Sequence, residues 1–274
     1  MKGNPHSHRQ QARNCCSAFS VTDLIALLAL ISLLALIQGS VLGNNKSNAE
    51  RAVCAENLRR LTLAWQMYAD DHAGALMGNP GVQGSLKSWV KGWLDFTTST
   101  DNTNTLYLTN TQHALMGLYV TSASLFRCPS DLSAISRAAG SVLRVRSYSM
   151  NGWVGQGAVG WNLAPFQVMQ KNSQISQPDG TFVLIEEHPD SINDPLLLVD
   201  MAGSGSRATI VDYPAAFHSG AANVAKADGR VEFWQWVDPR TMPPMRYGGL
   251  LPLNVPSPNN LDVARLQQAT TYRN

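Results

Sequence analysis

The chain has 274 residues, of which 44% are hydrophobic and 15% charged, a composition that excludes a disordered protein and allows one sizeable domain or two small ones. Its formal net charge is +2, and the Lys and Arg residues are scattered singly, so the sequence has no basic stripe for phosphates and nucleic acid is not an expected partner. Of the four cysteines, Cys15 and Cys16 precede the first apolar run, whereas Cys54 and Cys128 follow it.

The N-terminal segment combines a basic stretch with an apolar one. Residues 1–18 carry basic residues and no acid, and residues 24–42 carry no charge. A helix over 24–42 would extend roughly 28 Å, close to the hydrocarbon thickness of a bilayer. Basic residues ahead of such a span favour a cytoplasmic N-terminus and export of the rest. We therefore expect a single transmembrane pass, with an ordinary secretory signal cut near Ser40 to Asn44 as the alternative.

An acidic residue, Asp23, stands at the start of this apolar run, in the order Ala18-Phe19-Ser20-Val21-Thr22-Asp23. A charge inside a membrane costs about 2.5–3.5 kcal/mol at the centre of the bilayer and less near the interface, unless it is paired with a cation.

This N-terminus resembles that of type IV prepilins and pseudopilins, in which a basic leader is cut before a Phe and the fifth residue of the mature chain is acidic. The resemblance implies cleavage by prepilin peptidase between Ala18 and Phe19, N-methylation of Phe19, and pairing of Asp23 with the freed α-amino group of a neighbouring subunit. Ala18 and Asp23 stand where the family favours Gly and Glu, and an uncleaved signal anchor is the competing interpretation.

An amphipathic helix is expected to continue the apolar one. Apolar residues recur at intervals of four and three and therefore line one helix face: Cys54, Leu58, Leu61, Trp65 and Tyr68. We expect a leader over 1–18, a pilin-like helix over 19–70 and an exported globular head over 71–274.

The head is expected to be mostly strand and loop. A long Gly-, Ser-, Thr- and Asn-rich loop covers 74–110, and Asp228-Gly229 predicts a tight hairpin between two strands. The expected elements are a short helix at 111–118, strands at 144–150, 181–185, 221–225 and 230–236, and a capped helix at 260–266. The predicted fold class is α+β, with a long N-terminal helix, half transmembrane and half amphipathic, packed on an antiparallel β-sheet head.

Cys54 and Cys128 are candidates for a disulfide in an oxidising compartment. Cys54 lies on the predicted core-facing side of its helix, and Cys128 follows a predicted strand end. Pairing would close a loop of about 75 residues and contribute about 4 kcal/mol on the chain-entropy model. Two separate buried thiols are the alternative.

The C-terminal hairpin carries a second resemblance. His218 is followed by Asp228-Gly229 and then by Arg230-Val231-Glu232-Phe233-Trp234. The segment 218–236 resembles the processing-associated H-X9-DG domain of many prepilin-like proteins, and further stretches resemble the same group, among them Tyr68-Ala69-Asp70-Asp71, Cys128-Pro129-Ser130-Asp131 and Ser147-Tyr148-Ser149-Met150-Asn151-Gly152. The resemblance implies architecture and export route but little chemistry.

Acidic residues and a histidine gather at Glu186-Glu187-His188 and Asp190, where a hydrolase would need an acid and a base. No known catalytic motif is present, and for His218 and Asp228 we favour a structural role in tying the hairpin to the preceding loop. An enzyme is therefore not expected. Pseudopilin heads can carry Ca²⁺, and the weak candidate ligands here are Glu187, Asp190, Asp194 and Asp200.

These inferences favour a filament subunit in a bacterial inner membrane, with its head periplasmic or extracellular. Its expected partners are like subunits, prepilin peptidase and the membrane itself. The alternative is a membrane-anchored binding module, for example for glycans, that uses aromatic residues such as Trp89, Trp93, Trp153 and Trp161.

Overall fold

The computed structural model describes residues 20–80, 86–138, 140–158 and 165–273, and the side chains of residues 34–45 are not among those described. The leader 1–18, the junction Ala18-Phe19 and Trp161 lie outside the described residues. The chain divides into two compact units, Met1–Asn45 and Lys46–Asn274, which we call the N-terminal and C-terminal units.

The first helix, α1, runs from Val21 to Asp71 and belongs to both units. Its start is a capping box: the Asp23 N–H donates to Ser20 Oγ (3.2 Å), and the Ser20 N–H donates to Asp23 Oδ2 (2.9 Å). Its end is set by Gly74, which has a φ of +80° and donates its N–H to the Ala69 carbonyl at 2.8 Å.

The expected membrane span is corrected by the structure. Among the residues that are described, none of the helices combines the length and the apolar character needed to cross a bilayer. The transmembrane half over 24–42, and the single-pass inner-membrane localisation inferred from it, are therefore wrong as predictions.

A five-stranded sheet forms the centre of the C-terminal unit, in the order β5-β3-β4-β7-β8. β3 pairs antiparallel with β4 but parallel with β5, so the sheet is mixed and the prediction of an antiparallel sheet is wrong. The parallel pair is very short because β5 has only two residues. The strands are β3 (Tyr148–Asn151), β4 (Phe182–Glu186), β5 (Leu196–Leu197), β7 (Ala221–Lys226) and β8 (Val231–Gln235).

Smaller elements surround this sheet. Two short antiparallel pairs join β1 (Ala134–Arg137) to β2 (Gly140–Leu143) and β6 (Thr209–Ile210) to β9 (Val255–Pro256). The helices are α2 (Leu106–Thr109) and α3 (Leu261–Thr270), and α3 is capped by Asn260 Oδ1, which accepts the Asp262 and Val263 N–H groups. Six 3₁₀ turns complete the described elements: Thr100–Asn102, Leu115–Leu118, Ala123–Phe126, Asn172–Gln174, Gly205–Arg207 and Pro239–Thr241.

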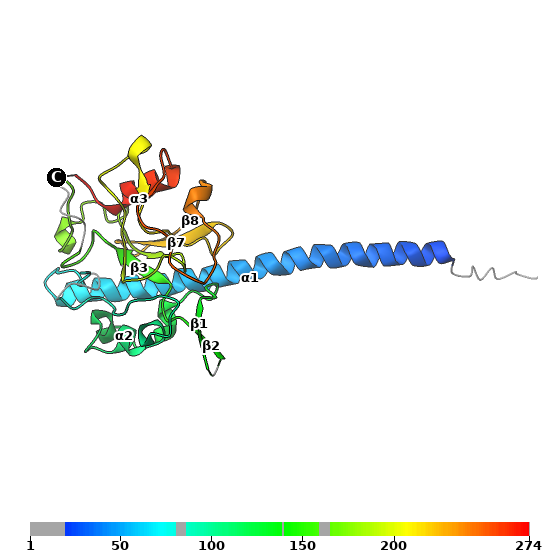
Figure 1. Ribbon diagram of the computed structural model, residues 1–274, viewed down its shortest axis with the longest axis horizontal. Helices are drawn as coiled ribbons and strands as arrows, with labels where there is room; N and C mark the ends of the chain where they lie inside the picture. The colour runs from blue at the N-terminus through cyan, green and yellow to red at the C-terminus, as the bar shows by residue number, and fades with distance from the viewer. Residues whose placement is uncertain (1–19, 81–85, 139, 159–164, 274) are drawn as a thin grey trace, which may run out of the picture. The chain divides into compact units, whose positions relative to one another are not determined.

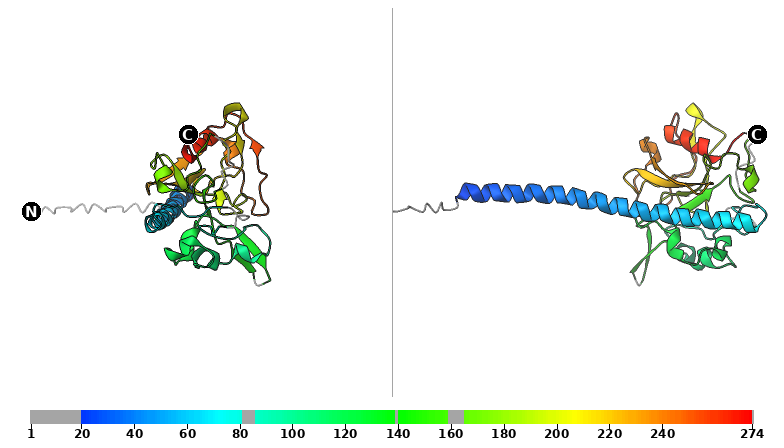
Figure 2. Two further views of the ribbon diagram at one scale, coloured as in Figure 1. Left: turned by 90° about the vertical axis from the view of Figure 1, so that its left-hand side faces the viewer. Right: turned by 180° about the vertical axis from the view of Figure 1, so that it is seen from behind.

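Within the C-terminal unit, α1 and α3 pack on opposite faces of the sheet (Figures 1 and 2). The apolar stripe of α1 is buried with Val183, Leu184 and Ala225 of the sheet, whereas Leu266 and Ala269 of α3 are buried with Phe182 and Ile185. The predicted stripe is therefore the core-facing side of α1. Arrangement of the sheet between two helices leaves little of its face in water.

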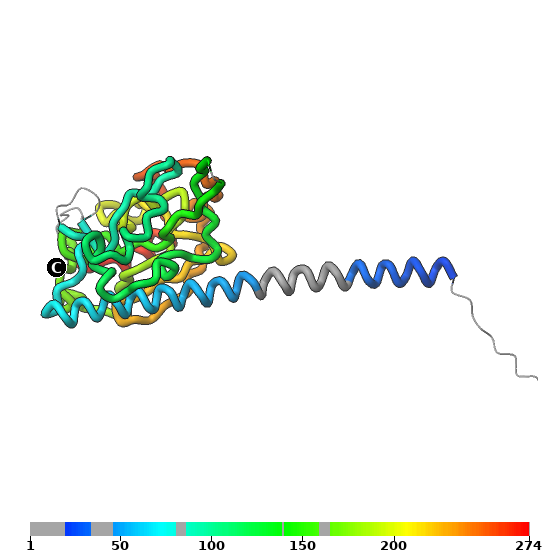
Figure 3. The backbone as a smooth tube through the Cα atoms, turned by 90° about the horizontal axis from the view of Figure 1, so that it is seen from below, coloured from blue at the N-terminus to red at the C-terminus, as the bar shows by residue number. Residues whose placement is uncertain are grey.

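The β7–β8 hairpin lies next to α1 (Figure 3). Gln66 Nε2 donates to the Ala227 carbonyl at 2.8 Å, and the Arg51 guanidinium stands 4.5 Å from the centre of the Phe233 ring. The hairpin joins the strands where Asp228-Gly229 predicts it, with Gly229 at a φ of +91°, a conformation that favours glycine.

Candidate functional site

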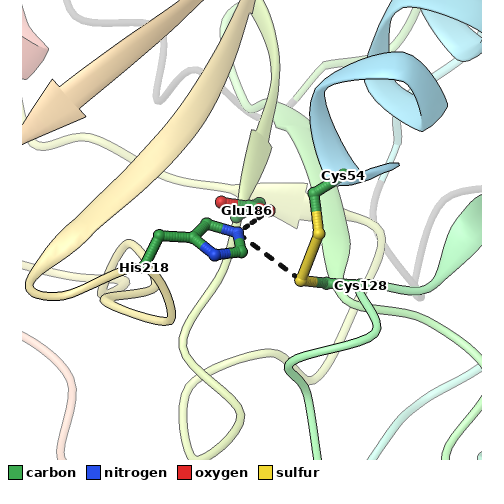
Figure 4. Close-up of side chains that lie close together, drawn as sticks. All are labelled: Cys54, Cys128, Glu186 and His218. Carbon is green, nitrogen blue, oxygen red and sulfur yellow. Dashed lines mark hydrogen bonds and ion pairs between the residues drawn. A yellow bond between two sulfur atoms is a disulfide. The ribbon is translucent and has the colours of Figure 1, made fainter. Parts of the chain in front are cut away.

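Four buried side chains from separate parts of the chain converge beneath α1 (Figure 4). Cys54 comes from α1, Cys128 from the loop after Phe126, Glu186 from the end of β4, and His218 from the loop before β7. One ligand-type atom of each lies within 4.8 Å of the others. We call these four residues the Cys–His–Glu cluster.

The two cysteines of the cluster form a disulfide, with Cα atoms 5.2 Å apart and a sequence separation of 74. Neighbouring hydrogen bonds fix both of its ends. Asn57 Nδ2 donates to the Arg127 carbonyl at 3.2 Å, and the Cys128 N–H donates to Ser147 Oγ at 3.1 Å. The bond therefore ties α1 to the segment that leads into β1.

His218 and Glu186 form a buried pair beside the disulfide. The His218 Nε2 atom lies 3.0 Å from Glu186 Oε1 and 3.7 Å from Cys128 Sγ. An N–H at Nε2 would donate to this carboxylate. Glu186 Oε2 accepts the Asn223 N–H at 2.7 Å, so the carboxylate is held from the sheet side.

This arrangement is not that of a nucleophile, base and orienting acid. In such a triad one ring nitrogen meets the nucleophile and the other meets the acid. Here Nε2 faces both Glu186 and the sulfur of Cys128, while His218 Nδ1 is buried with no hydrogen-bond partner among the described residues. The cluster offers a disulfide, an imidazole and a carboxylate in a buried site, which suits cross-linking or metal binding.

The H-X9-DG residues lie at opposite ends of β7. His218 precedes the strand and belongs to the cluster, whereas Asp228 follows it and accepts the Arg230 N–H at 3.0 Å in the hairpin turn. The side chains of His218 and Asp228 therefore contact different parts of the fold.

The acidic residues considered for catalysis or Ca²⁺ accept hydrogen bonds from backbone and side-chain donors in different loops. Asp190 accepts the N–H groups of Arg246 and Tyr247, and Glu187 accepts the Ser191 hydroxyl at 2.8 Å. Asp194 accepts the Leu196 N–H, and Asp200 accepts the Thr209 hydroxyl at 2.7 Å. Among the described residues, the Cys–His–Glu cluster is the one group of three or more potential metal-binding side chains brought together.

Glu187 and Asp212 are two buried acids that interact with each other, and Glu187 also interacts with Arg146. Burial raises the pKa of Asp212 to about 7, although the Leu198 N–H donates to its carboxylate at 2.7 Å. Burial and the charge of Asp212 also raise the pKa of Glu187 well above its usual range. Both acids therefore tend to keep a proton in the folded chain at pH values where they would lose it in water.

The raised pKa of Asp212 makes stability fall as the pH rises. Between the ordinary pKa of 3.8 and about 7, the folded state holds a proton that the unfolded state has released. The free energy of unfolding then decreases by up to about 1.4 kcal/mol per pH unit for this group. Above about pH 7 this contribution is constant.

Asp212→Asn is expected to remove that dependence, since the amide keeps an oxygen for the Leu198 N–H and does not titrate. Urea unfolding between pH 4 and pH 8 measures the free energy of unfolding of both chains. As the pH rises to about 7, this free energy should fall for the unmodified chain relative to the variant. Asp179→Asn, at an exposed position, is the matched control and should leave the pH profile unchanged. Parallel profiles for Asp212→Asn and the unmodified chain would contradict the assignment.

Two of the tryptophans considered for glycan binding are buried. Trp89 and Trp153 are 0% and 1% exposed, and their indole N–H groups donate to the carbonyls of Pro195 and Val199, each at 3.0 Å. Both are core residues and present no surface to a ligand. Of the three described tryptophans in this group, Trp93 is the exposed one, at 37%.

Comparison with known proteins yields no relative: no protein-family model, no curated protein and no solved structure matches the chain. Sequence reasoning named Cys54, Cys128 and His218 but did not connect His218 to the disulfide, and it assigned Glu186 to another cluster. A pairing between residues so far apart in sequence leaves no periodic pattern. The one available signal was the motif histidine itself, placed just ahead of a buried strand.

Proposed function

We propose that the chain is a subunit of a pilin-like filament, cut by prepilin peptidase between Ala18 and Phe19 and assembled with copies of itself through the first turns of α1. The observation that carries the proposal is the exposure of the apolar side chains there. Over residues 21–33 these are exposed by between 45% and 74%: Val21, Leu24, Ile25, Leu27, Leu28, Leu30, Ile31 and Leu33.

These apolar side chains surround the helix rather than lining one face. Successive residues of an α-helix are about 100° apart, so Leu24, Ile25, Leu27 and Leu28 already point in different directions around the axis. A helix that is apolar on all sides is stable only when all sides are covered. A bundle of equivalent helices from other copies would cover all sides of the helix. A single partner surface would cover only one side.

Asp23 supports the same proposal. The Ser20 backbone N–H, followed by the Ser20 hydroxyl, lowers the pKa of Asp23, which therefore favours its charged form. Residues 20–33 contain no basic side chain that would neutralise this charge when neighbouring helices exclude water. The α-amino group of a neighbouring copy, freed by cleavage before Phe19, is a cation that would meet this requirement.

The test separates this assembly role from the local capping role. Asp23→Asn keeps an acceptor for the Ser20 N–H but removes the charge, whereas Ser20→Ala removes part of the capping box and keeps the charge. In cells that carry prepilin peptidase and its assembly machinery, Asp23→Asn should abolish filaments seen by electron microscopy, and Ser20→Ala should retain them. N-terminal sequencing of the mature chain should begin at Phe19.

Two results would count against the proposal in different ways. An intact N-terminus ahead of Phe19 would exclude the processing step. Equal filament yields from Asp23→Asn and the unmodified chain would exclude the charge pairing at the helix interface.

A further inference from the structure

The Cys–His–Glu cluster has the chemical composition of a zinc site. Two cysteine sulfurs, one imidazole nitrogen and one carboxylate oxygen are the three kinds of ligand that Zn²⁺ takes in proteins, and four ligands complete a structural site. All four side chains are fully or almost fully buried, with exposures between 0% and 2%. They come from four separate segments, so a metal bound among them would cross-link the fold.

The spacing of these atoms also fits a metal. Zn–S distances near 2.3 Å and Zn–N distances near 2.0–2.1 Å place the ligand atoms of a tetrahedral site about 3.3–3.8 Å from one another. His218 Nε2 lies 3.7 Å from Cys128 Sγ and 3.0 Å from Glu186 Oε1. The four ligand atoms lie within 4.8 Å of one another, so binding would require the sulfur–sulfur bond to open and the side chains to close around the metal.

Residues behind the ligands hold them in orientation. The Asn223 N–H donates to Glu186 Oε2 at 2.7 Å, which leaves Oε1 directed toward His218 and the sulfurs (Figure 4). The Cys128 N–H donates to Ser147 Oγ, and that hydroxyl donates to Asp131 Oδ2 at 2.6 Å. Supporting hydrogen bonds of this kind fix ligand geometry and raise metal affinity.

We propose that the reduced chain binds one Zn²⁺ through Cys54 Sγ, Cys128 Sγ, His218 Nε2 and Glu186 Oε1. A dithiol reductant transfers two electrons and two protons to the disulfide, becomes a disulfide itself and leaves two thiols on the chain. Binding of Zn²⁺ releases both thiol protons, and the imidazole binds through the lone pair of Nε2 while its proton resides on Nδ1.

The cluster would then cross-link the same segments of the fold in two alternative ways. In the oxidised chain a covalent bond joins α1 to the segment before β1, and in the reduced chain the metal joins these two segments to β4 and to the loop before β7. This inference does not depend on the filament proposal. It concerns only residues of the C-terminal unit.

The experiment uses the full chain with Cys15→Ser and Cys16→Ser, so that the leader contributes no thiol. The chain is reduced under denaturing conditions and refolded without oxygen in the presence of Co²⁺, a spectroscopic substitute for Zn²⁺. We expect one Co²⁺ per chain, with the visible bands of tetrahedral coordination and a thiolate charge-transfer band, and displacement by Zn²⁺. The oxidised chain should take up none.

His218→Ala should lower the affinity for Co²⁺ at least about tenfold, whereas His113→Ala, a histidine outside the cluster, should leave it unchanged. Glu186→Gln, a more conservative replacement, should weaken binding while retaining the thiolate band. Absence of tetrahedral Co²⁺ in the reduced chain, whether that chain is folded or unfolded, overturns the proposal. Equal uptake by the oxidised chain, or unchanged affinity in His218→Ala, also overturns it.

Discussion

Replacing Cys54 and Cys128 together with alanine is expected to lower the free energy of unfolding of the C-terminal unit by about 4 kcal/mol. The two residues are separated by 74 positions, so without the bond the unfolded chain gains the freedom of a long open loop. Alanine is preferred to serine because it adds no hydroxyl beside His218 in the buried cluster.

Urea unfolding followed by tryptophan fluorescence measures this loss. The matched control is the pair Cys15→Ser and Cys16→Ser, which removes two cysteines but keeps the Cys54–Cys128 bond, and its unfolding curve should match that of the unmodified chain. Chemical reduction of the unmodified chain, without metal, should give a similar loss. A loss below about 1 kcal/mol in the double alanine variant would show that the bond adds little to stability.

Arg146→Met is expected to lower the free energy of unfolding by about 3–5 kcal/mol, although it removes a buried charge. The Arg146 guanidinium donates to the carbonyls of Tyr148 and Asp194, at 3.1 and 2.9 Å, and to Ser149 Oγ at 3.2 Å. Methionine fills much of the same space but donates to none of these acceptors.

Electrostatics act in the same direction. Burial lowers the pKa of Arg146 to about 10, and the charge of Glu187 opposes that shift, so the arginine stays protonated near neutral pH. Without it, the buried carboxyl group of Asp194 loses a compensating charge.

Arg59→Met provides the control, because this arginine makes an exposed ion pair with Glu56 and should change stability by less than about 1 kcal/mol. Thermal unfolding at pH 7 measures both variants. Equal stability of Arg146→Met and the unmodified chain would mean that the three hydrogen bonds are replaced by water.

Local signals account for the parts of the fold that sequence predicted well. The stripe from Cys54 to Tyr68 repeats at the helical period and lies on the core face of α1, and Asp228-Gly229 forms the turn of the β7–β8 hairpin. Asn260, followed by an amphipathic run, caps α3. Each of these signals is contained in a few neighbouring residues.

The errors arose where distant segments meet or where a pattern had two meanings. The parallel pairing of β5 with β3 involves only Leu196 and Leu197, too short a run to show a period. The run 24–42 matched a membrane span in composition, a match that the described helices do not support. Ser20 and Asp23 have the spacing of a capping box, and the structure shows its two hydrogen bonds. The sequence interpretation considered only the charge of Asp23.

The disulfide has a mechanical consequence. A pulling force applied along α1 enters the C-terminal unit before Cys54, crosses to Cys128 through the covalent bond, and bypasses the whole segment between them. That segment, fully extended, would add roughly 250 Å of contour length. While the bond is intact this length cannot be released, so a chain under tension would extend only through the residues before Cys54 and after Cys128. A covalent bond in this place would protect the segment between the two cysteines from unravelling under load.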